Sequence, residues 1–344
     1  MDEPFRNSTA SKDVKITVIG GGTGSFTMLS ALKKHTKQIA AVVNMADDGG
    51  STGVLRDELG TLPPGDVRQC LVALSDSPKI RDLFDYRFEE GTLQGHSFGN
   101  ILLTALEKVT GSFSEAVATA SDILRIDGTV IPATLDDVRL KMEWEETSLI
   151  LQGERLIDAD HFKYDPRKAK LSLVPEPDAN PMAIEAIIRA DIIVISPGDL
   201  YTSLGPLLVI NGIGAALQNS KALKIYVSNL VTKDGQTTGF TVNDHVKEIE
   251  RFAGVDFIDW VLYNNGKPTA KIAEKYEQEK GYITEVDKDL LDKAHYKSLG
   301  GNFLGEMAQE SSADTLPVTR SLIRHDAKTV AESIMEIYKN ARKS

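Results

Sequence analysis

The sequence predicts an α/β protein built on a three-layer, Rossmann-like and mostly parallel sheet, with a small β-rich insertion. Three observations lead to this fold class. Apolar runs rich in β-branched residues recur along the chain, helical patterns lie between them, and glycine-rich or polar loops follow them. Uninterrupted apolar runs are typical of parallel strands that helices cover on both faces. Their alternation with helices favours a doubly wound sheet.

Five apolar runs are the predicted strands of this sheet. They cover residues 14–20, 39–45, 190–196, 223–229 and 257–264. After the first strand, apolar residues from Phe26 to Leu32 recur at helical spacing, and the same spacing recurs from Val330 to Ala341. We therefore expect a helix at each of these places.

Residues 129–175 have a different pattern, in which apolar and polar residues alternate and turn residues are frequent. Such alternation indicates hairpin strands, so we expect a β-rich insertion at about 129–175. The chain as a whole is expected to form a single α/β domain over residues 13–342, after a disordered tail at residues 1–12.

Composition and charge limit the partners. The chain has 344 residues, a formal net charge of −11 and 26% charged residues, which argues against nucleic acid or an anionic membrane as the main partner. No apolar stretch approaches the ~20 residues that span a bilayer. The single cysteine, Cys70, excludes an intrachain disulfide and a cysteine metal cluster, and it fits a cytoplasmic location.

The loop GGGTGS, residues 20–25, joins a predicted strand to a predicted helix. It differs from the dinucleotide fingerprint G-x-G-x-x-G, since Ser25 stands at the last position, and it is not a P-loop. A glycine-rich turn still exposes backbone N–H groups at the positive end of the following helix. We therefore predict a phosphate-type ligand at Gly21, Gly22, Thr23 and Gly24.

Asp47 and Asp48 follow the second predicted strand, within MADDGGSTG. Asp47 lies 23 positions after Gly24, which is about where an acidic residue of a dinucleotide fold binds a ribose hydroxyl. Two adjacent carboxylates can instead hold Mg²⁺ or serve as general bases. All three roles stay open, and these two residues are the candidate catalytic groups.

Two predicted helix starts supply further polar side chains. In TLPPGDVRQCL, Asp66 is placed to cap the helix, and Arg68 on its first turn can reach an anionic ligand. In GHSFGNILLTAL, Ser97 and Asn100 stand at the start of an apolar helix, where one of them can be the cap.

The loop SPGDLYTSLGPLL, residues 196–208, is a second predicted anion cradle. Asn229 follows the next strand, and Arg324 before the last helix can complement phosphate charge. Because ligands collect at the carboxyl ends of strands in open α/β sheets, we expect these loops to lie together. Two cradles without an obvious nucleophile or base favour a binding protein over an enzyme. The candidate ligand contacts of the second cradle are Pro197, Gly198, Asp199, Tyr201, Thr202 and Ser203.

Several long segments resemble the gluconeogenesis factor family (YvcK type), which shares a superfamily with CofD, the 2-phospho-L-lactate transferase of coenzyme F420 synthesis. The resemblance covers residues 14 to 342. Its segments include VIGGGTGSFTMLSALKK, AVVNMADDGGSTGVLRDELGTLPPGDVRQCLVALSD, GHSFGNILLTAL, GTVIPATLDDVRL, DIIVISPGDLYTSL and YVSNLVTKDGQTTGFTVNDHV.

The resemblance implies a cytoplasmic regulator that binds a nucleotide sugar, UDP-N-acetylglucosamine. It also implies a role in cell shape, in growth on gluconeogenic carbon sources and in cell-wall precursor supply, with a protein partner in that metabolism. Self-association stays open.

Two alternatives remain. The transferase relatives move a phospholactyl group from a guanylyl donor to a deazaflavin with Mg²⁺, and this chain keeps their GGTG loop and their Asp47–Asp48 pair. It then continues with GGSTGVLRDELGTLPPGD, which resembles the gluconeogenesis factors instead. An NAD-type dinucleotide ligand is favoured by the glycine loop and Asp47 and weakened by the missing third glycine.

Overall fold

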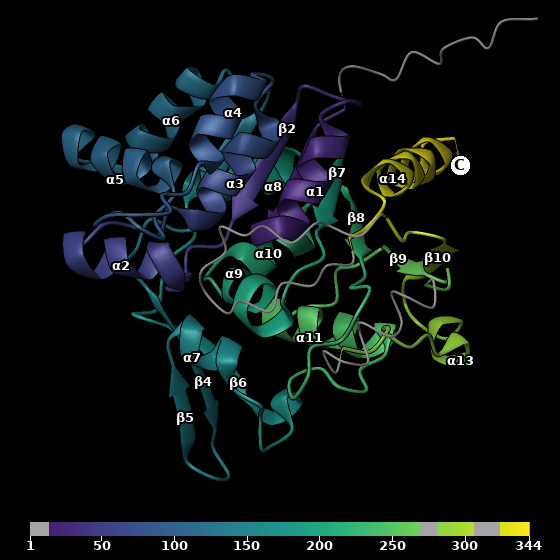
Figure 1. Ribbon diagram of the computed structural model, residues 1–344. Helices are drawn as coiled ribbons and strands as arrows, with labels where there is room; N and C mark the ends of the chain where they lie inside the picture. The colour runs from purple at the N-terminus through teal and green to yellow at the C-terminus, as the bar shows by residue number, and fades with distance from the viewer. Residues whose placement is uncertain (1–13, 269–280, 306–323, 344) are drawn as a thin grey trace, which may run out of the picture.

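Seven parallel strands form the central sheet of the computed structural model, which describes residues 14–268, 281–305 and 324–343. Their order is β10-β9-β8-β7-β1-β2-β3. Figure 1 labels β10, β9, β8, β7 and β2. The predicted tail at residues 1–12 lies outside the described residues. The strands are β1 (Ile16–Gly20), β2 (Ile39–Val43), β3 (Thr129–Pro132), β7 (Ile192–Ile195), β8 (Leu223–Val227), β9 (Trp260–Asn264) and β10 (Lys297–Gly301).

All five predicted strands are present, and two strands were placed wrongly or missed. Residues Thr129–Pro132, expected to belong to the insertion, instead form β3, which pairs with β2 at one edge of the main sheet. The insertion therefore begins later than residue 129. Strand β10 escaped prediction because its sequence, KSLGG, contains a single large apolar residue, Leu299.

Helices cover both faces of the sheet and enclose two separate apolar clusters. Side chains alternate along each strand, so that Val18 faces one cluster and Ile19 the other. Around the cluster that contains Val18 lie α1 (Gly22–Leu32), α3 (Gly65–Leu74), α4 (Pro78–Asp85), α5 (Phe98–Thr110), α6 (Phe113–Leu124) and α14 (Ala327–Ala341). Helix α2 (Gly50–Leu59) contacts α5.

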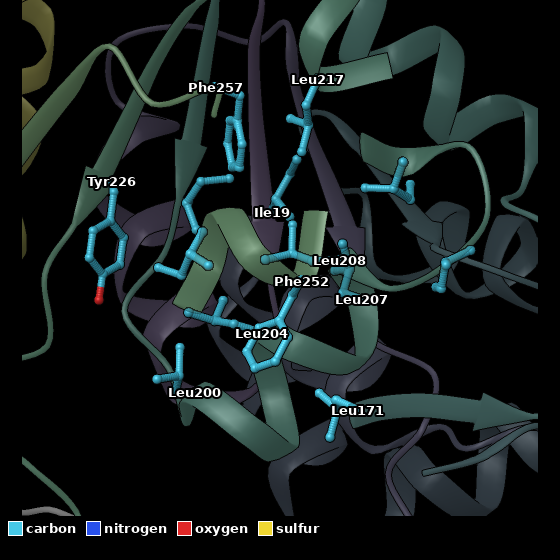
Figure 2. Close-up of a cluster of buried hydrophobic side chains, with 14 of the residues drawn as sticks. Ile19, Leu171, Leu200, Leu204, Leu207, Leu208, Leu217, Tyr226, Phe252 and Phe257 are labelled. Atoms are coloured by element: carbon cyan, nitrogen blue, oxygen red, sulfur yellow. The ribbon is translucent and has the colours of Figure 1, made fainter. Parts of the chain in front are cut away.

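The opposite cluster is drawn in Figure 2, where Ile19 points from the sheet toward Leu208, Leu217 and Phe252. Packing there is tight enough to require glycine, because a methyl group on Gly205 would come within 2.4 Å of Leu171. The helices on this side are α8 (Pro181–Arg189), the π-helical turn η2 (Leu200–Leu204), α9 (Gly205–Leu208), α10 (Ile213–Asn219) and α11 (Val242–Ala253).

A small antiparallel sheet of order β5-β4-β6 confirms the predicted β-rich insertion (Figure 1). In β4, Leu140, Met142 and Trp144 are buried and alternate with half-buried residues, as expected of a sheet with one face in the core. The insertion also contains an unpredicted helix, which contributes to the site described below. Its elements are β4 (Arg139–Trp144), β5 (Leu149–Gln152), α7 (Glu154–Ala159), η1 (Pro166–Lys168) and β6 (Lys170–Val174).

Two further findings bear on the sequence predictions. Cys70 is buried and free, as a small apolar core residue would be. In the part of the chain that the structure describes, no helix has both the length and the hydropathy needed to cross a bilayer. A further helical element within the described residues is α13 (Lys288–Leu291), on the side of the molecule near β10.

Candidate functional site

The strand order creates a topological switch point between β1 and β7. From β1 the chain continues to β2 and β3 in one direction, whereas from β7 it continues to β8, β9 and β10 in the other. The loops that follow β1 and β7 therefore leave neighbouring strand ends toward opposite sides, which is where open α/β sheets bind ligands. We call residues 20–25 and 196–203 the switch-point loops.

The two switch-point loops touch each other, as the sequence analysis expected. Ser25 Oγ and Ser196 Oγ are 2.9 Å apart in a buried hydrogen bond. A methyl group on Gly24 would come within 1.6 Å of the carbonyl oxygen of Pro197, and one on Gly20 within 2.1 Å of Ser196 Oγ. These contacts explain why the first loop is so rich in glycine: its backbone passes close to the second loop.

Helix α1 begins directly in the first loop. Gly21 is its N-cap residue and supplies no side-chain acceptor to the first turn. The half-buried residues Gly22, Thr23 and Gly24 therefore present the positive end of an eleven-residue helix at the switch point.

Asp66 has a role that the sequence analysis did not foresee. Pro64, not Asp66, is the N-cap residue of α3, and Asp66 lies in the first helical turn. Its carboxylate faces the glycine loop, since a methyl group on Gly21 would come within 2.2 Å of Asp66 Oδ2. A carboxylate therefore already lies against the turn into α1.

The adjacent carboxylates Asp47 and Asp48 have separate environments. Asp47 Oδ1 accepts a hydrogen bond from the Gly49 N–H at 2.9 Å, and burial raises the pKa of Asp47, which the nearby Asp48 charge raises further. Asp48 accepts hydrogen bonds from the N–H groups of Glu154 and Arg155 at 3.2 and 2.8 Å. Asp48 thus caps α7, a helix remote in sequence.

Helix α7 contributes two acidic residues, Glu154 and Asp158, near the switch point, and no sequence pattern predicted this contribution. Glu154 Oε2 lies 3.4 Å from the position that a methyl group on Gly49 would take. Asp158, one turn later, forms an ion pair with Lys233, and Lys233 Nζ also lies 2.8 Å from Asp199 Oδ2. We refer to Asp47, Asp48, Glu154, Asp158 and Asp199 as the acidic cluster.

Besides Asp47, charges of this cluster shift the pKa values of Glu154 and Lys233. Burial raises the pKa of Glu154, and the neighbouring carboxylates raise it further, beginning with Asp47. Burial lowers the pKa of Lys233, but Asp199 and Asp158 outweigh that effect and raise it overall. Lys233 is therefore a firmly protonated cation among carboxylates.

Glu154→Gln is expected to stabilise the folded protein by about 1–2 kcal/mol at pH 8. A raised folded-state pKa means that stability falls as pH rises from the ordinary glutamate value of about 4.3 through the raised pKa, and the amide removes this loss. The gain should vanish near pH 4, in urea unfolding followed at several pH values. Glu185→Gln, at an exposed site paired with Arg189, is the control; equal or lower stability of Glu154→Gln at pH 8 would contradict the assignment.

The second switch-point loop is tied to the end of β8 by Asn229. Its side chain accepts a hydrogen bond from the Gly198 N–H at 3.3 Å and donates one to the Gly198 carbonyl at 2.8 Å. Pro197 contacts Gly24. Ser203, in the same loop, is half-buried beside Gly198. Asn229, predicted as a ligand contact, therefore holds the loop in position.

Two predicted ligand contacts of this loop, Tyr201 and Thr202, are buried side chains. Tyr201 lies in the core, packed edge-on against Phe162 and Phe252, and its hydroxyl donates to Glu248 Oε2 at 3.1 Å. Thr202 is also buried, with its hydroxyl 3.4 Å from Asp158 Oδ1. Both residues belong to the π-helical turn η2, which places Tyr201 in the core and Thr202 against Asp158 of the acidic cluster, and the sequence spacing did not reveal this.

Arg68, Ser97 and Asn100 form one polar network with the start of α2. Arg68 Nε donates to Asn100 Oδ1 at 3.1 Å, and Asn100 Nδ2 to Ser51 Oγ at 3.4 Å. Ser97 caps α5 by accepting from the Asn100 N–H, as expected of one of the two residues. Arg68 also pairs with Asp85, so its charge is compensated within the chain.

Arg324 lies in the segment before α14, next to the end of β8. Its carbonyl accepts from the Gly305 N–H at 2.8 Å, and the neighbouring His325 Nε2 lies 3.0 Å from the Ser228 carbonyl. Burial lowers the pKa of His325 to about 4, so this histidine is neutral near pH 7. The segment therefore belongs to the same edge of the sheet as Asn229.

Comparison with known proteins decides the family. The family described as 2-phospho-L-lactate transferase CofD matches residues 16–304, which include every strand of both sheets. The chain belongs to the CofD family. The resemblance noted from the loop sequences is thereby confirmed.

Within the CofD family, this chain is similar to proteins named gluconeogenesis factor. The one from Bacillus subtilis is 38% identical over 328 residues, which cover 94% of this chain and 98% of that protein. The one from Halalkalibacterium halodurans is 38% identical over 329 residues, which cover 94% and 97%. A crystal structure of a UPF0052 family protein from Bacillus halodurans has a TM-score of 0.84 at 36% identity, over 94% of this chain and 100% of that one.

Proposed function

We propose that this CofD-family chain is a cytoplasmic regulator that binds a nucleotide sugar, UDP-N-acetylglucosamine, at the switch point. In this proposal it adjusts the supply of cell-wall precursors, and so supports cell shape and growth on gluconeogenic carbon sources. The observation that carries the proposal is the contact between the two switch-point loops at the start of α1, whose N-cap residue, Gly21, has no side chain to cap the helix. The names of the relatives support the metabolic setting.

The binding mode follows from the polar groups at the two loops. Backbone N–H groups of Gly22, Thr23 and Gly24 would hold the diphosphate at the positive end of α1, once the Asp66 carboxylate beside Gly21 turns aside. Asp47 would accept hydrogen bonds from ribose or sugar hydroxyls. Lys233, which pairs with Asp158 and Asp199, would contribute positive charge to a diphosphate only in part, because these two carboxylates already balance it.

Calorimetric titration with UDP-N-acetylglucosamine, GDP and NAD, each with and without Mg²⁺, tests this function. We expect selective binding of the UDP sugar without its consumption. Thr23→Asp should weaken that binding at least about tenfold, because a carboxylate at the second position of α1 favours the helix but repels phosphate. Ser114→Asp at the equivalent position of α6 is the matched control and should bind as the parent does. No binding of the UDP sugar, or equal affinity of Thr23→Asp and Ser114→Asp for it, would contradict the proposal.

Transfer from a nucleotide-activated donor is the second candidate, and the family description favours it. Mg²⁺ would then belong near Asp47 and Asp48. The carboxylate oxygens there fit Mg²⁺ poorly, because Asp48 already accepts hydrogen bonds from two backbone N–H groups and lies 3.5 Å from Arg139. Among the residues that the structure describes, no group of three or more His, Cys, Asp or Glu side chains is arranged to hold a metal. Turnover of a nucleotide-activated donor that Asp47→Asn abolishes would favour this candidate, and selective NAD binding would favour a dinucleotide ligand.

A further inference from the structure

A surface cavity of about 380 Å³ lies where α2 and α5 end and α6 begins. None of its lining residues belongs to the switch-point loops or to the acidic cluster, so the proposed function gives it no role. The lining residues are Gly60, Thr61, Leu62, Glu107, Gly111, Ser112, Phe113, Leu135 and Asp137.

The cavity is electronegative. Its two ionisable lining residues, Glu107 and Asp137, are both acidic, but Asp137 is ion-paired with the buried Arg56, so the negative charge of the cavity comes from Glu107. Gly60 and Gly111 are the left-handed C-caps of α2 and α5, so the negative ends of two helices meet at the cavity. The one helix that begins there, α6, has its first turn capped by the Ser112 side chain, which accepts from the Glu115 N–H.

The same cavity has an apolar floor and an apolar rim. Leu62 and Phe113 are buried beneath it, while Leu135 is 44% exposed at its edge. Leu59, directly before Gly60, is also 44% exposed. A methyl group on either capping glycine would meet no atom within 4 Å, so the mouth of the cavity is open.

We propose that this cavity binds a lysine or arginine side chain of a partner protein, presented by a segment with an adjacent aliphatic residue. The alkyl stem of the basic side chain would lie on Leu62 and Phe113, with its charge at Glu107 and the helix ends. The adjacent aliphatic residue would cover Leu135 and Leu59. A small free amine bound in the cavity would instead leave both leucines exposed to water. The net charge of −11 disfavours a second copy of this chain as the occupant.

Titration of the full-length, methyl-labelled protein with two pentapeptide amides tests the proposal by NMR. The peptides are acetyl-Gly-Leu-Arg-Leu-Gly and its Glu counterpart, in which the central arginine is replaced. The Arg peptide should shift the methyl signals of Leu62 and Leu135 and bind at least about tenfold more tightly than the Glu peptide. Equal affinity for the two peptides, or no shift of these methyl signals, would overturn the proposal. This result does not depend on whether the protein binds a nucleotide.

Variants separate docking from folding. In the parent protein the Leu62 N–H donates to the Glu107 carboxylate at 3.2 Å, and Glu107→Gln keeps an acceptor for it. This variant should bind the Arg peptide about three- to tenfold more weakly. Leu135→Ser should weaken it as well, whereas Leu83→Ser on α4, with the same 44% exposure, should not. A dimer of the parent protein in light scattering that Leu135→Ser dissociates would instead assign the cavity to a second copy of the chain.

Discussion

Gly24→Ala is expected to cost at least about 4 kcal/mol of unfolding free energy, or to prevent folding altogether. Helix propensity alone predicts the opposite, because alanine is better than glycine in a helix by about 0.5–1 kcal/mol. The steric contact decides the sign, since the new methyl group would come within 1.6 Å of the Pro197 carbonyl oxygen. Backbone, unlike the end of a long side chain, cannot easily move aside.

Urea denaturation measures this effect, and Gly60→Ala is its control. Gly60 has a positive φ of 59°, but a methyl group there meets nothing within 4 Å. The control should therefore lose only about 1 kcal/mol, from the left-handed backbone conformation. Similar losses for the two variants would show that the switch-point loops are not held in the contact described above.

Lys233→Met is expected to destabilise the protein by about 2 kcal/mol near pH 7, a figure reduced because the side chain is 33% exposed. Asp158 and Asp199 would lose their shared cation and repel each other and the rest of the acidic cluster. Lys233→Arg keeps the charge and should recover most of the loss.

The pH dependence gives this prediction a second readout. A raised lysine pKa contributes stability that is fully present below the unfolded value of about 10.4 and is lost as pH rises through the folded value. The difference between the parent protein and Lys233→Met should therefore shrink in strongly alkaline solution, in thermal unfolding followed from pH 7 upward. A pH-independent difference would mean that Lys233 acts through packing rather than through charge.

Much of the fold could be predicted because the buried parallel strands carry their own signal. The run from Ile192 to Ile195 is wholly buried, and its continuous β-branched sequence predicted this burial. Strand β10 lacked that signal, since its burial comes from pairing with β9 at an edge rather than from apolar residues. Strand β3 carried the signal but lay next to the alternating pattern of the insertion, so its sheet was assigned wrongly.

The candidate site could be predicted only as far as it consists of loops after strands. Gly24, Asp47 and Gly198 follow β1, β2 and β7, which are neighbours in the sheet, and chain topology is enough to bring them together. Glu154 and Lys233 lie in an insertion helix and a distant loop, and only tertiary packing places them there. The burial of Tyr201 likewise depends on the local register of η2, which single-residue chemistry does not specify.

The pairing of β1 with β7 has a consequence for how the chain folds as it is synthesised. Ile16 pairs with Ile192, and the Lys15–Asp191 contact beside it spans 176 residues. Until the ribosome has delivered β7, one edge of the central strand β1 has no neighbour, and unpaired edges of this kind invite aggregation. Closing so long a segment is slow, since non-local parallel pairing must offset a large loss of chain entropy. The switch-point loops therefore meet only after the chain through Ser203 has emerged, and until then the nascent chain exposes an unpaired edge of β1.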